Sequence, residues 1–356
     1  MATSVIPTTM KAVVFDESGG QVSVKEHPVP TIADNEILVK TVAISQNPSE
    51  WKHIDWKLGK PGSILGLDYS GIVVKAGKDV SSGPKVGDHV AGVAHSGAYP
   101  DKGAFAEYVK ADPELVWIVP ENTFSHEQAA AYGTVFWTAV QALYNPKHLG
   151  LVEPPKKVAK PEWILIYGGS TACGLSAIQL AHLSGYKVVT TASSRNHELL
   201  KSLGADVAVD YHEHDLVAKI KQATGDAIKY GADMIADDET KKVTVQAIGP
   251  SGGKVVGLNP LQSEESGRND VTCSNTMLNS VYGYAYSIGS TQLPAVPQDK
   301  AHMAAFLKKL PQLVRDGAIK PKLPIKLWEG GLEAVQDGLQ YMREGRVSAE
   351  KIVYRV

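Results

Sequence analysis

The chain has 356 residues, 43% of them hydrophobic, and its formal net charge is -2 at pH 7. A chain of this length can bury a large apolar core and is expected to form about two domains. Its 36 basic and 38 acidic residues are spread along the sequence, which excludes a block of like charge that would favour nucleic acid or a membrane surface as a partner.

Targeting and cysteine content add two expectations. No segment approaches the ~20 apolar residues of a membrane span, and the N-terminus lacks the basic flank and apolar core of a signal peptide, so a cytoplasmic protein is expected. Cys173 and Cys273 are the only cysteines, which excludes a disulfide framework and a zinc site of four thiolates. Both are expected to be buried apolar residues.

Strand-like segments fill the first third of the chain, from Met10 to about Val119. Gly, Pro and Asp separate them, as is usual for strands joined by turns. The segments are residues 11–15, 21–25, 36–42, 70–74, 86–90 and 103–109. This pattern predicts a small, mainly β, barrel-like antiparallel domain.

After Pro120 helices and strands alternate. Ser125 can accept a hydrogen bond from an orphan amide, which predicts a helix from there to about Leu143. A connector rich in Pro and Lys follows at residues 151–161. Strands are then predicted at residues 163–167, 187–191, 206–210, 234–236 and 253–257, with helices at 175–184 and up to Leu203. Alternation of this kind predicts an α/β Rossmann fold with a doubly wound parallel sheet.

A glycine-rich turn joins the first of these strands to its helix. Small residues let backbone amides approach a pyrophosphate, which the N-terminus of the helix then stabilises. If Gly169 and Gly174 are the outer glycines of a G-x-G-x-x-G motif, Thr171 takes the place of the middle one. The alternative is a plain tight connection, which the surrounding strand–helix–strand unit disfavours.

The residues after the second strand indicate which dinucleotide is bound. Enzymes selective for NAD usually carry Asp or Glu there, but this chain has Ser193, Ser194, Arg195 and Asn196. Because hydroxyls and a guanidinium are good donors to a phosphate, these residues favour NADPH. The alternative is that Arg195 is a solvated residue of the first helical turn.

Six motifs in order along the chain resemble the medium-chain dehydrogenase/reductase superfamily. They are Asn47–Lys52, Leu65–Val73, Val86–Val90, Glu127–Ala131, Tyr167–Thr171 and Asp210–Tyr211. Within it, the turn at Tyr167, Leu258-Asn259-Pro260 and the segment from Val347 to Val353 most resemble the fungal trans-acting enoyl reductases of polyketide synthesis. The resemblance implies a GroES-like catalytic domain at 1–126, an NADPH-binding Rossmann domain at 127–299, and a return to the catalytic domain at 300–356.

Zinc-dependent members of this superfamily need a Cys, a Gly-His-Glu segment and a further ligand. Here the corresponding segments are Ser45–Pro48 and Gly66-Leu67-Asp68, so a zinc-independent enzyme with no metal is expected.

The resemblance also implies a set of site residues. The cofactor would contact Ser49, Glu50, Trp51, Lys52, Gly168, Gly169, Ser170, Thr171, Ala172, Cys173, Ser193, Ser194, Arg195, Asn196, Tyr211, Leu258, Asn259, Val347 and Ser348. Substrate would be bordered by Thr138, Ala139, Val140, Gln141, Tyr282, Gly283, Tyr284, Ala285 and Tyr286. Lys52 and Thr138 are the catalytic candidates, as donors to a developing oxyanion, and backbone amides are the alternative donors. Lys52 could instead be solvated, and the tyrosines could serve in packing.

The implied function is an enoyl reductase of secondary metabolism. It would transfer hydride from NADPH to an α,β-unsaturated polyketide thioester on an acyl carrier protein, which would be its partner; the chain would be a monomer. The proton donor stays unassigned. A free-standing quinone or alkenal reductase, and a non-catalytic NADPH-binding scaffold or sensor, are the alternatives.

Overall fold

A computed structural model describes residues 5–260 and 267–356. The chain divides into two compact units, one of Met1–Thr134 with Asn279–Val356 and one of Val135–Leu278. Residues 127–134 and 279–299 therefore belong to the first unit rather than to the expected cofactor domain. Within the described residues, no helix is long and apolar enough to cross a membrane.

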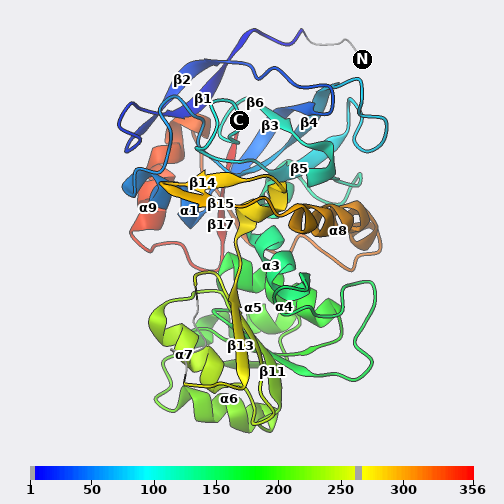
Figure 1. The fold of residues 1–356 in the computed structure, drawn as a ribbon, viewed down its shortest axis with the longest axis vertical. Helices are drawn as coiled ribbons and strands as arrows, with labels where there is room; N and C mark the ends of the chain where they lie inside the picture. Colours follow the sequence, from blue (N-terminus) through cyan, green and yellow to red (C-terminus); the bar gives the residue numbers. More distant parts are fainter. Residues whose placement is uncertain (1–4, 261–266) are drawn as a thin grey trace. The chain divides into compact units, whose positions relative to one another are not determined.

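The first unit is built on a seven-stranded, mostly antiparallel sheet (Figure 1). Its strand order is β16-β17-β3-β4-β5-β7, and β6 pairs with β3. The strands are β3 (Ile37–Ser45), β4 (Asp68–Ala76), β5 (His89–Val93), β6 (Tyr108–Ala111), β7 (Val116–Ile118), β16 (Ile325–Leu327) and β17 (Lys351–Arg355). A hairpin of β1 (Thr9–Phe15) and β2 (Val22–Pro28) and a smaller one of β14 (Tyr286–Ile288) and β15 (Thr291–Leu293) complete its strands.

Burial of β-branched and aromatic side chains holds this unit together. Ile37, Val39, Ile44 and Tyr354 belong to one buried cluster shared by the sheet and the C-terminal segment. Its helices are α1 (Pro48–Asp55), α2 (His126–Ala131), α8 (Pro297–Arg315) and α9 (Val335–Arg343), with the short turns η1 (Pro113–Leu115), η4 (Leu278–Tyr282) and η5 (Gly331–Ala334). Because α2 packs on β3, β4 and β17, it belongs to this unit.

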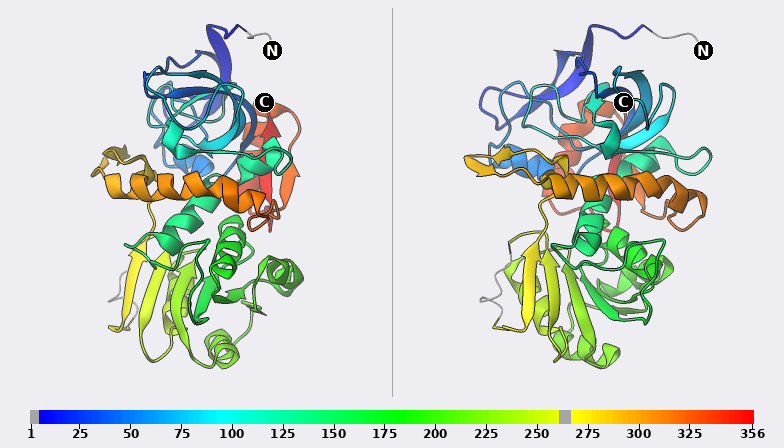
Figure 2. Two further views of the ribbon diagram at one scale, coloured as in Figure 1. Left: turned by 90° about the vertical axis from the view of Figure 1, so that its right-hand side faces the viewer. Right: turned by 45° about the vertical axis from the view of Figure 1, so that its right-hand side comes forward.

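The second unit contains one parallel six-stranded sheet, and Figure 2 shows its strands side by side and twisted. The strand order β10-β9-β8-β11-β12-β13 is that of a dinucleotide-binding Rossmann fold, so the predicted fold class is confirmed. Its strands are β8 (Trp163–Tyr167), β9 (Lys187–Thr191), β10 (Val207–Val209), β11 (Ile228–Asp233), β12 (Gly253–Gly257) and β13 (Val271–Asn275). The helices are α3 (Thr134–Tyr144), α4 (Ala172–Leu183), α5 (His197–Leu203), α6 (Leu216–Thr224) and α7 (Asp238–Gln246), with η2 at Ser194–Asn196.

Several predicted elements differ from the structure. The segments predicted as strands at 86–90 and 103–109 are extended only in their last residues, which begin β5 and β6. The strand expected at 234–236 is wrong: β11 ends at Asp233, whose carboxylate accepts bonds from the Ile235 and Ala236 amides and turns the backbone. The helix expected from Ser125 to about Leu143 is broken into α2 and α3 at Gly133. A Cβ on Gly133 would lie 2.4 Å from an Asp68 carboxylate oxygen, so the break lets this carboxylate approach the chain.

Candidate active site

The start of α1 is fixed by its own side chains. Pro48 is the first helical residue, and Glu50 accepts a hydrogen bond from the Asn47 amide at 2.6 Å. The other oxygen of Glu50 accepts from the Leu67 amide at 3.2 Å, which ties the helix to the segment before β4. Glu50 is 0% exposed, so its side chain supports the helix from inside. This burial differs from the expectation that Glu50 contacts the cofactor.

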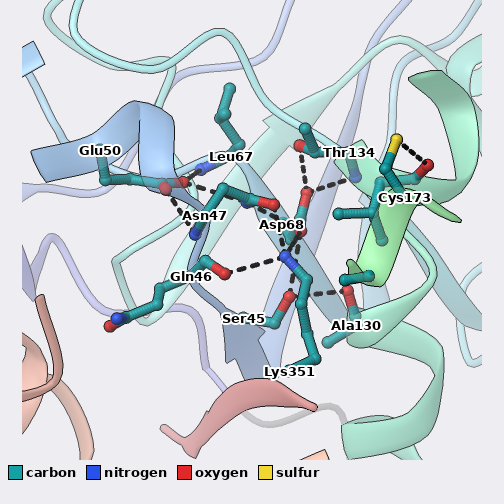
Figure 3. Close-up of polar contacts among 12 residues, drawn as sticks. Ser45, Gln46, Asn47, Glu50, Leu67, Asp68, Ala130, Thr134, Cys173 and Lys351 are labelled. Carbon is teal, nitrogen blue, oxygen red and sulfur yellow. Dashed lines mark hydrogen bonds and ion pairs between the residues drawn. The ribbon is translucent and has the colours of Figure 1, made fainter. Parts of the chain in front are cut away.

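Asp68 lies at the centre of a buried network next to the start of this helix (Figure 3). One carboxylate oxygen accepts a hydrogen bond from the Ser45 hydroxyl at 3.0 Å and one from the side-chain amide of Asn47 at 2.9 Å. The other accepts from the backbone N–H and the hydroxyl of Thr134, at 2.6 and 2.5 Å. Asp68 thus connects β3, α1 and the beginning of α3.

Lys351, the first residue of β17, supplies the positive charge of the network. Its ammonium lies 3.1 Å from the Asp68 carboxylate and donates to the Gln46 carbonyl at 2.8 Å and to the Asn47 side chain. Lys351 is 3% exposed and Asp68 is 0% exposed. Burial, and next the Asp68 charge, raise the pKa of Glu50 to about 7, which Lys351 partly opposes. The Lys351 ammonium therefore stabilises the negative charge of both Asp68 and Glu50.

The zinc-ligand positions of the related dehydrogenases fall inside this network. Ser45 donates to Asp68 and to the Ala130 carbonyl, while Leu67 is a buried apolar residue. Hydroxyl and alkyl groups are poor zinc ligands. The arrangement thus holds α1 in place by hydrogen bonds and one ion pair.

The remaining predicted residues of α1 carry polar groups that are not used within the protein. The Ser49 hydroxyl and the Trp51 indole N–H are buried, and neither has a hydrogen-bond partner among the described residues. Lys52 lies 5.7 Å from the Trp51 ring centre and 5.8 Å from that of Trp56. A buried donor without a partner is costly, so these atoms suit a bound polar group such as a nicotinamide.

In the second unit, the glycine-rich turn adopts the geometry of a pyrophosphate loop. It follows β8, a central strand, and leads directly into α4, whose N-cap Thr171 accepts from the Gly174 amide at 3.0 Å. A Cβ on Gly169 would lie 2.0 Å from the Thr190 hydroxyl, and one on Gly174 2.3 Å from the Gly168 carbonyl. The residues present therefore fit a dinucleotide. Cys173 is turned inward, with its thiol donating to the Val135 carbonyl at 3.2 Å.

The loop after β9 holds the residues expected at the adenosine phosphate. Ser194 and Arg195 are exposed, and the Ser193 hydroxyl lies 3.4 Å from that of Tyr211. Sequence reasoning named Asp210 only as part of a motif; in the structure it accepts a hydrogen bond from the Ser194 hydroxyl at 2.5 Å and from the Ser194 backbone amide at 2.9 Å. The Ser194 and His212 hydrogen bonds keep the pKa of Asp210 well below its usual range. Ser194 is thus held by a carboxylate.

The other predicted residues are divided between the two units. Thr138, Ala139, Val140 and Gln141 lie on α3 of the second unit, all buried, with Thr138 9% exposed. Leu258 and Asn259 follow β12, and the Asn259 amide group donates to the Ala236 carbonyl at 3.0 Å. Val347 and Ser348 precede β17 in the first unit.

The tyrosine segment belongs to the first unit and meets a histidine that sequence reasoning missed. His95, which is 3% exposed, bonds through Nδ1 to the Tyr284 hydroxyl at 3.0 Å. Its ring stacks on that of Tyr282 with 4.7 Å between centres. In the sequence, His95 stands five residues beyond the predicted strand at 86–90, a position that does not reveal a partner 189 residues away.

A second histidine cluster makes stability depend on pH. The Ser70 hydroxyl lies 2.7 Å from His89 Nε2 and 3.0 Å from His126 Nδ1, and the two rings are 3.7 Å apart. Burial, and then His126, lower the pKa of His89 from 6.5 to about 4, and burial also lowers the pKa of His126. Below about pH 6.5, these two histidines therefore bind protons more readily in the unfolded chain than in the folded protein.

We therefore expect the stabilisation by His89 to be complete above pH 6.5 and to be lost as the pH falls toward 4. Glu50 acts in the opposite sense: because its pKa is raised from 4.5 to about 7, its contribution is present below 4.5 and is lost as the pH rises through 7. Urea unfolding over this range should show a weaker pH dependence for His89→Gln than for the wild type. Equal dependence in both proteins would contradict the role of His89.

Comparison with known proteins gives the family. Residues 33–121 match the family described as alcohol dehydrogenase GroES-like domain, and residues 172–298 match zinc-binding dehydrogenase. The chain belongs to the medium-chain dehydrogenase/reductase superfamily, and it is an oxidoreductase of the kind that uses a nicotinamide cofactor.

The predicted resemblance to fungal trans-acting enoyl reductases is also confirmed. A trans-enoyl reductase of Alternaria alternata is 38% identical over 350 residues, which cover 98% of this chain and 99% of that protein. One from Xenoacremonium sinensis is 38% identical over 360 residues, covering 98% and 96%. Among solved structures, a quinone oxidoreductase from Coxiella burnetii has a TM-score of 0.72 and 26% identity, covering 98% of this chain and 99% of that one.

Proposed function

We propose that this protein is a trans-acting enoyl reductase that uses NADPH to reduce an α,β-unsaturated polyketide thioester carried by an acyl carrier protein. The observation that carries the proposal is the similarity, over almost the whole chain, to proteins named trans-enoyl reductases. The unpartnered donors of α1 and the pyrophosphate-type turn before α4 support it.

Nicotinamide, when bound, supplies the hydride for the β-carbon of the alkene. The protein's own contribution is to orient the alkene, exclude water and stabilise the oxyanion that forms on the thioester. Lys52 is the proposed donor to this oxyanion in the first unit, and Thr138 is the candidate in the second. The Asp68–Lys351 network would keep α1, and with it Ser49 and Lys52, in one position.

An assay with two substrate classes tests the reaction. The enzyme should oxidise NADPH faster with an enoyl pantetheine thioester than with a quinone, and Lys52→Met should lower kcat/KM for the thioester by about tenfold or more. A quinone reductase is the second candidate, favoured by the similarity to the Coxiella burnetii enzyme. Faster turnover of the quinone would overturn the enoyl proposal. Binding of NADPH without turnover of any alkene or quinone would instead favour a scaffold or sensor.

The partner can be tested separately. If the substrate is a chain on a carrier protein, a polyketide synthase without its own working reductase should release reduced product only when this protein is added. Reduced product in its absence would contradict the trans-acting role.

Arg195 provides the test of cofactor choice. We expect binding of NADPH to be at least about tenfold tighter than that of NADH, because charge-assisted bonds to a phosphate contribute ~1.5–3 kcal/mol each. Arg195→Asp should narrow or reverse this preference, as measured by the Kd of each dinucleotide. Lys201→Asp, an exposed residue on α5 in the same unit, serves as the control for a general change in charge. Unchanged affinities in Arg195→Asp, or an equal effect in the control, would remove the phosphate role.

A further inference from the structure

A cavity of about 300 Å³ lies within the first unit, beside the stacked His95 and Tyr282. It is lined by Asn35, Glu36, Val93, Ala94, His95, Lys102, Lys110, Ala111, Asp112, Leu115, Tyr282, Tyr284 and Lys300. One wall of the cavity is joined to α1 by hydrogen bonds: the amide of the lining residue Ala94 donates to the Leu67 carbonyl at 2.7 Å, and the Leu67 amide donates to Glu50 of α1 at 3.2 Å. The segment around Leu67 thus connects this wall with the helix that carries Ser49 and Lys52.

Three polar groups on its wall are not used by the protein itself. The Tyr282 hydroxyl is buried and has no hydrogen-bond partner within the part of the chain that the structure describes. His95 uses Nδ1 on Tyr284, and no bond to its Nε2 occurs among the described residues. Lys102 rests on aromatic rings, 5.0 Å from the centre of Tyr99 and 5.2 Å from that of Tyr284, with no ion pair to any described carboxylate.

The charges of the wall indicate to which kind of group the Tyr282 hydroxyl and the Lys102 ammonium would donate. Lys300 is paired with Asp112 at 2.7 Å and with Glu114 at 2.9 Å, and Lys110 is paired with Asp101 at 2.6 Å, so these groups carry one surplus negative charge. Lys102 and Glu36 remain, and their formal charges cancel. His95 adds no charge, since burial, with Lys102 next, lowers its pKa to about 4. A neutral oxygen acceptor satisfies such donors without adding an unbalanced charge, whereas a plain alkyl chain would leave them unpaired.

We propose that this cavity binds the far end of the acyl chain and selects chains that carry a keto or hydroxyl oxygen there, with Tyr282, His95 and Lys102 as the hydrogen-bonding residues. The inference rests on the proposed reduction of an enoyl thioester and adds its specificity. The aromatic faces of Tyr282 and Tyr284 accommodate the carbon chain, and the polar groups fix the position of its oxygen.

The test compares two enoyl pantetheine thioesters of equal length, one ending in a methyl ketone and one in an alkyl group. We expect kcat/KM of the wild type to favour the ketone by at least about tenfold, since a site built for hydrogen bonds discriminates against analogues that lack them. Tyr282→Phe and Lys102→Met should each bring this ratio closer to one. Lys75→Met, an exposed change on β4 outside the cavity, should leave the ratio as in the wild type.

Two outcomes separate this inference from the proposed function. If both chains are reduced but the wild type does not favour the ketone, or the ratio is the same in the cavity variants, the cavity does not select oxygenated chains. If neither chain is reduced, the proposed function fails, and calorimetry with the saturated methyl-ketone thioester then tests the cavity alone. The wild type should bind this thioester, and Tyr282→Phe should bind it several times more weakly. Absence of binding, or equal binding by both proteins, overturns the inference.

Discussion

Lys351→Met is expected to lower the free energy of unfolding by about 3–5 kcal/mol, because it leaves buried carboxyl groups without their cation. The Asp68 carboxylate is 0% exposed and would keep its hydrogen bonds from Ser45, Asn47 and Thr134, but no positive charge. Met has nearly the shape of the lysine stem, so lost packing contributes little. Urea unfolding at neutral pH measures the effect.

Two further variants identify the cause of this loss. Lys78→Met removes an ion pair with Asp34 in which the side chains of Lys78 and Asp34 are 73% and 60% exposed. It should lower the free energy of unfolding by no more than about 1 kcal/mol. Adding Asp68→Asn to Lys351→Met should recover part of the lost stability, because an asparagine oxygen can still accept from the Thr134 amide and carries no charge. If the double variant is no more stable than Lys351→Met, the unpaired carboxylate is not the cause.

Gly174→Ala should both destabilise the second unit and weaken dinucleotide binding. A Cβ at this position would lie 2.3 Å from the Gly168 carbonyl oxygen and 2.8 Å from the Gly169 Cα, which are backbone atoms of the turn and cannot rotate away. Relief requires the turn to move off the start of α4. We expect a loss of about 1–3 kcal/mol in the free energy of unfolding and at least about a tenfold rise in the Kd for NADPH.

Gly20→Ala is the matched control for this variant. Its added Cβ would find its nearest neighbours at 3.4 and 3.5 Å, all in side chains, which is ordinary contact. Stability and dinucleotide affinity should both stay near the wild-type values. If Gly174→Ala binds NADPH as tightly as Gly20→Ala does, the close approach of turn and helix is not what shapes the dinucleotide site.

Local pattern was sufficient to predict the class of fold and about half of the strands. The segments 163–167, 187–191 and 253–257 coincide with β8, β9 and β12, because buried parallel strands are short apolar runs between turn residues. β13 was missed, since Val271–Asn275 is rich in polar residues and gains its place only by pairing with β12. The break at Gly133 was also missed, because its cause is the distant Asp68.

The site could be predicted only where its residues are neighbours in sequence. The glycine-rich turn and the loop of Ser193–Asn196 each follow a strand and are visible as local patterns. The network is different, because Lys351 and Asp68 are separated by 283 positions. Glutamate is usually an exposed residue type, and only the hydrogen bonds from the Asn47 and Leu67 amides show why Glu50 is buried. Pairing between residues so far apart in the sequence depends on the tertiary structure, and local sequence patterns carry no information about it.

The position of β17 has a consequence for the order in which the protein folds during synthesis. The second unit is formed by one continuous stretch, Val135–Leu278, and can fold as soon as that stretch has left the ribosome. The first unit must wait, because β3 obtains its β17 neighbour, and Asp68 its cation, only when residues 351–355 have been made. Nascent chains should therefore carry a finished nucleotide-binding half together with an open sheet edge, and such unpaired edges favour aggregation.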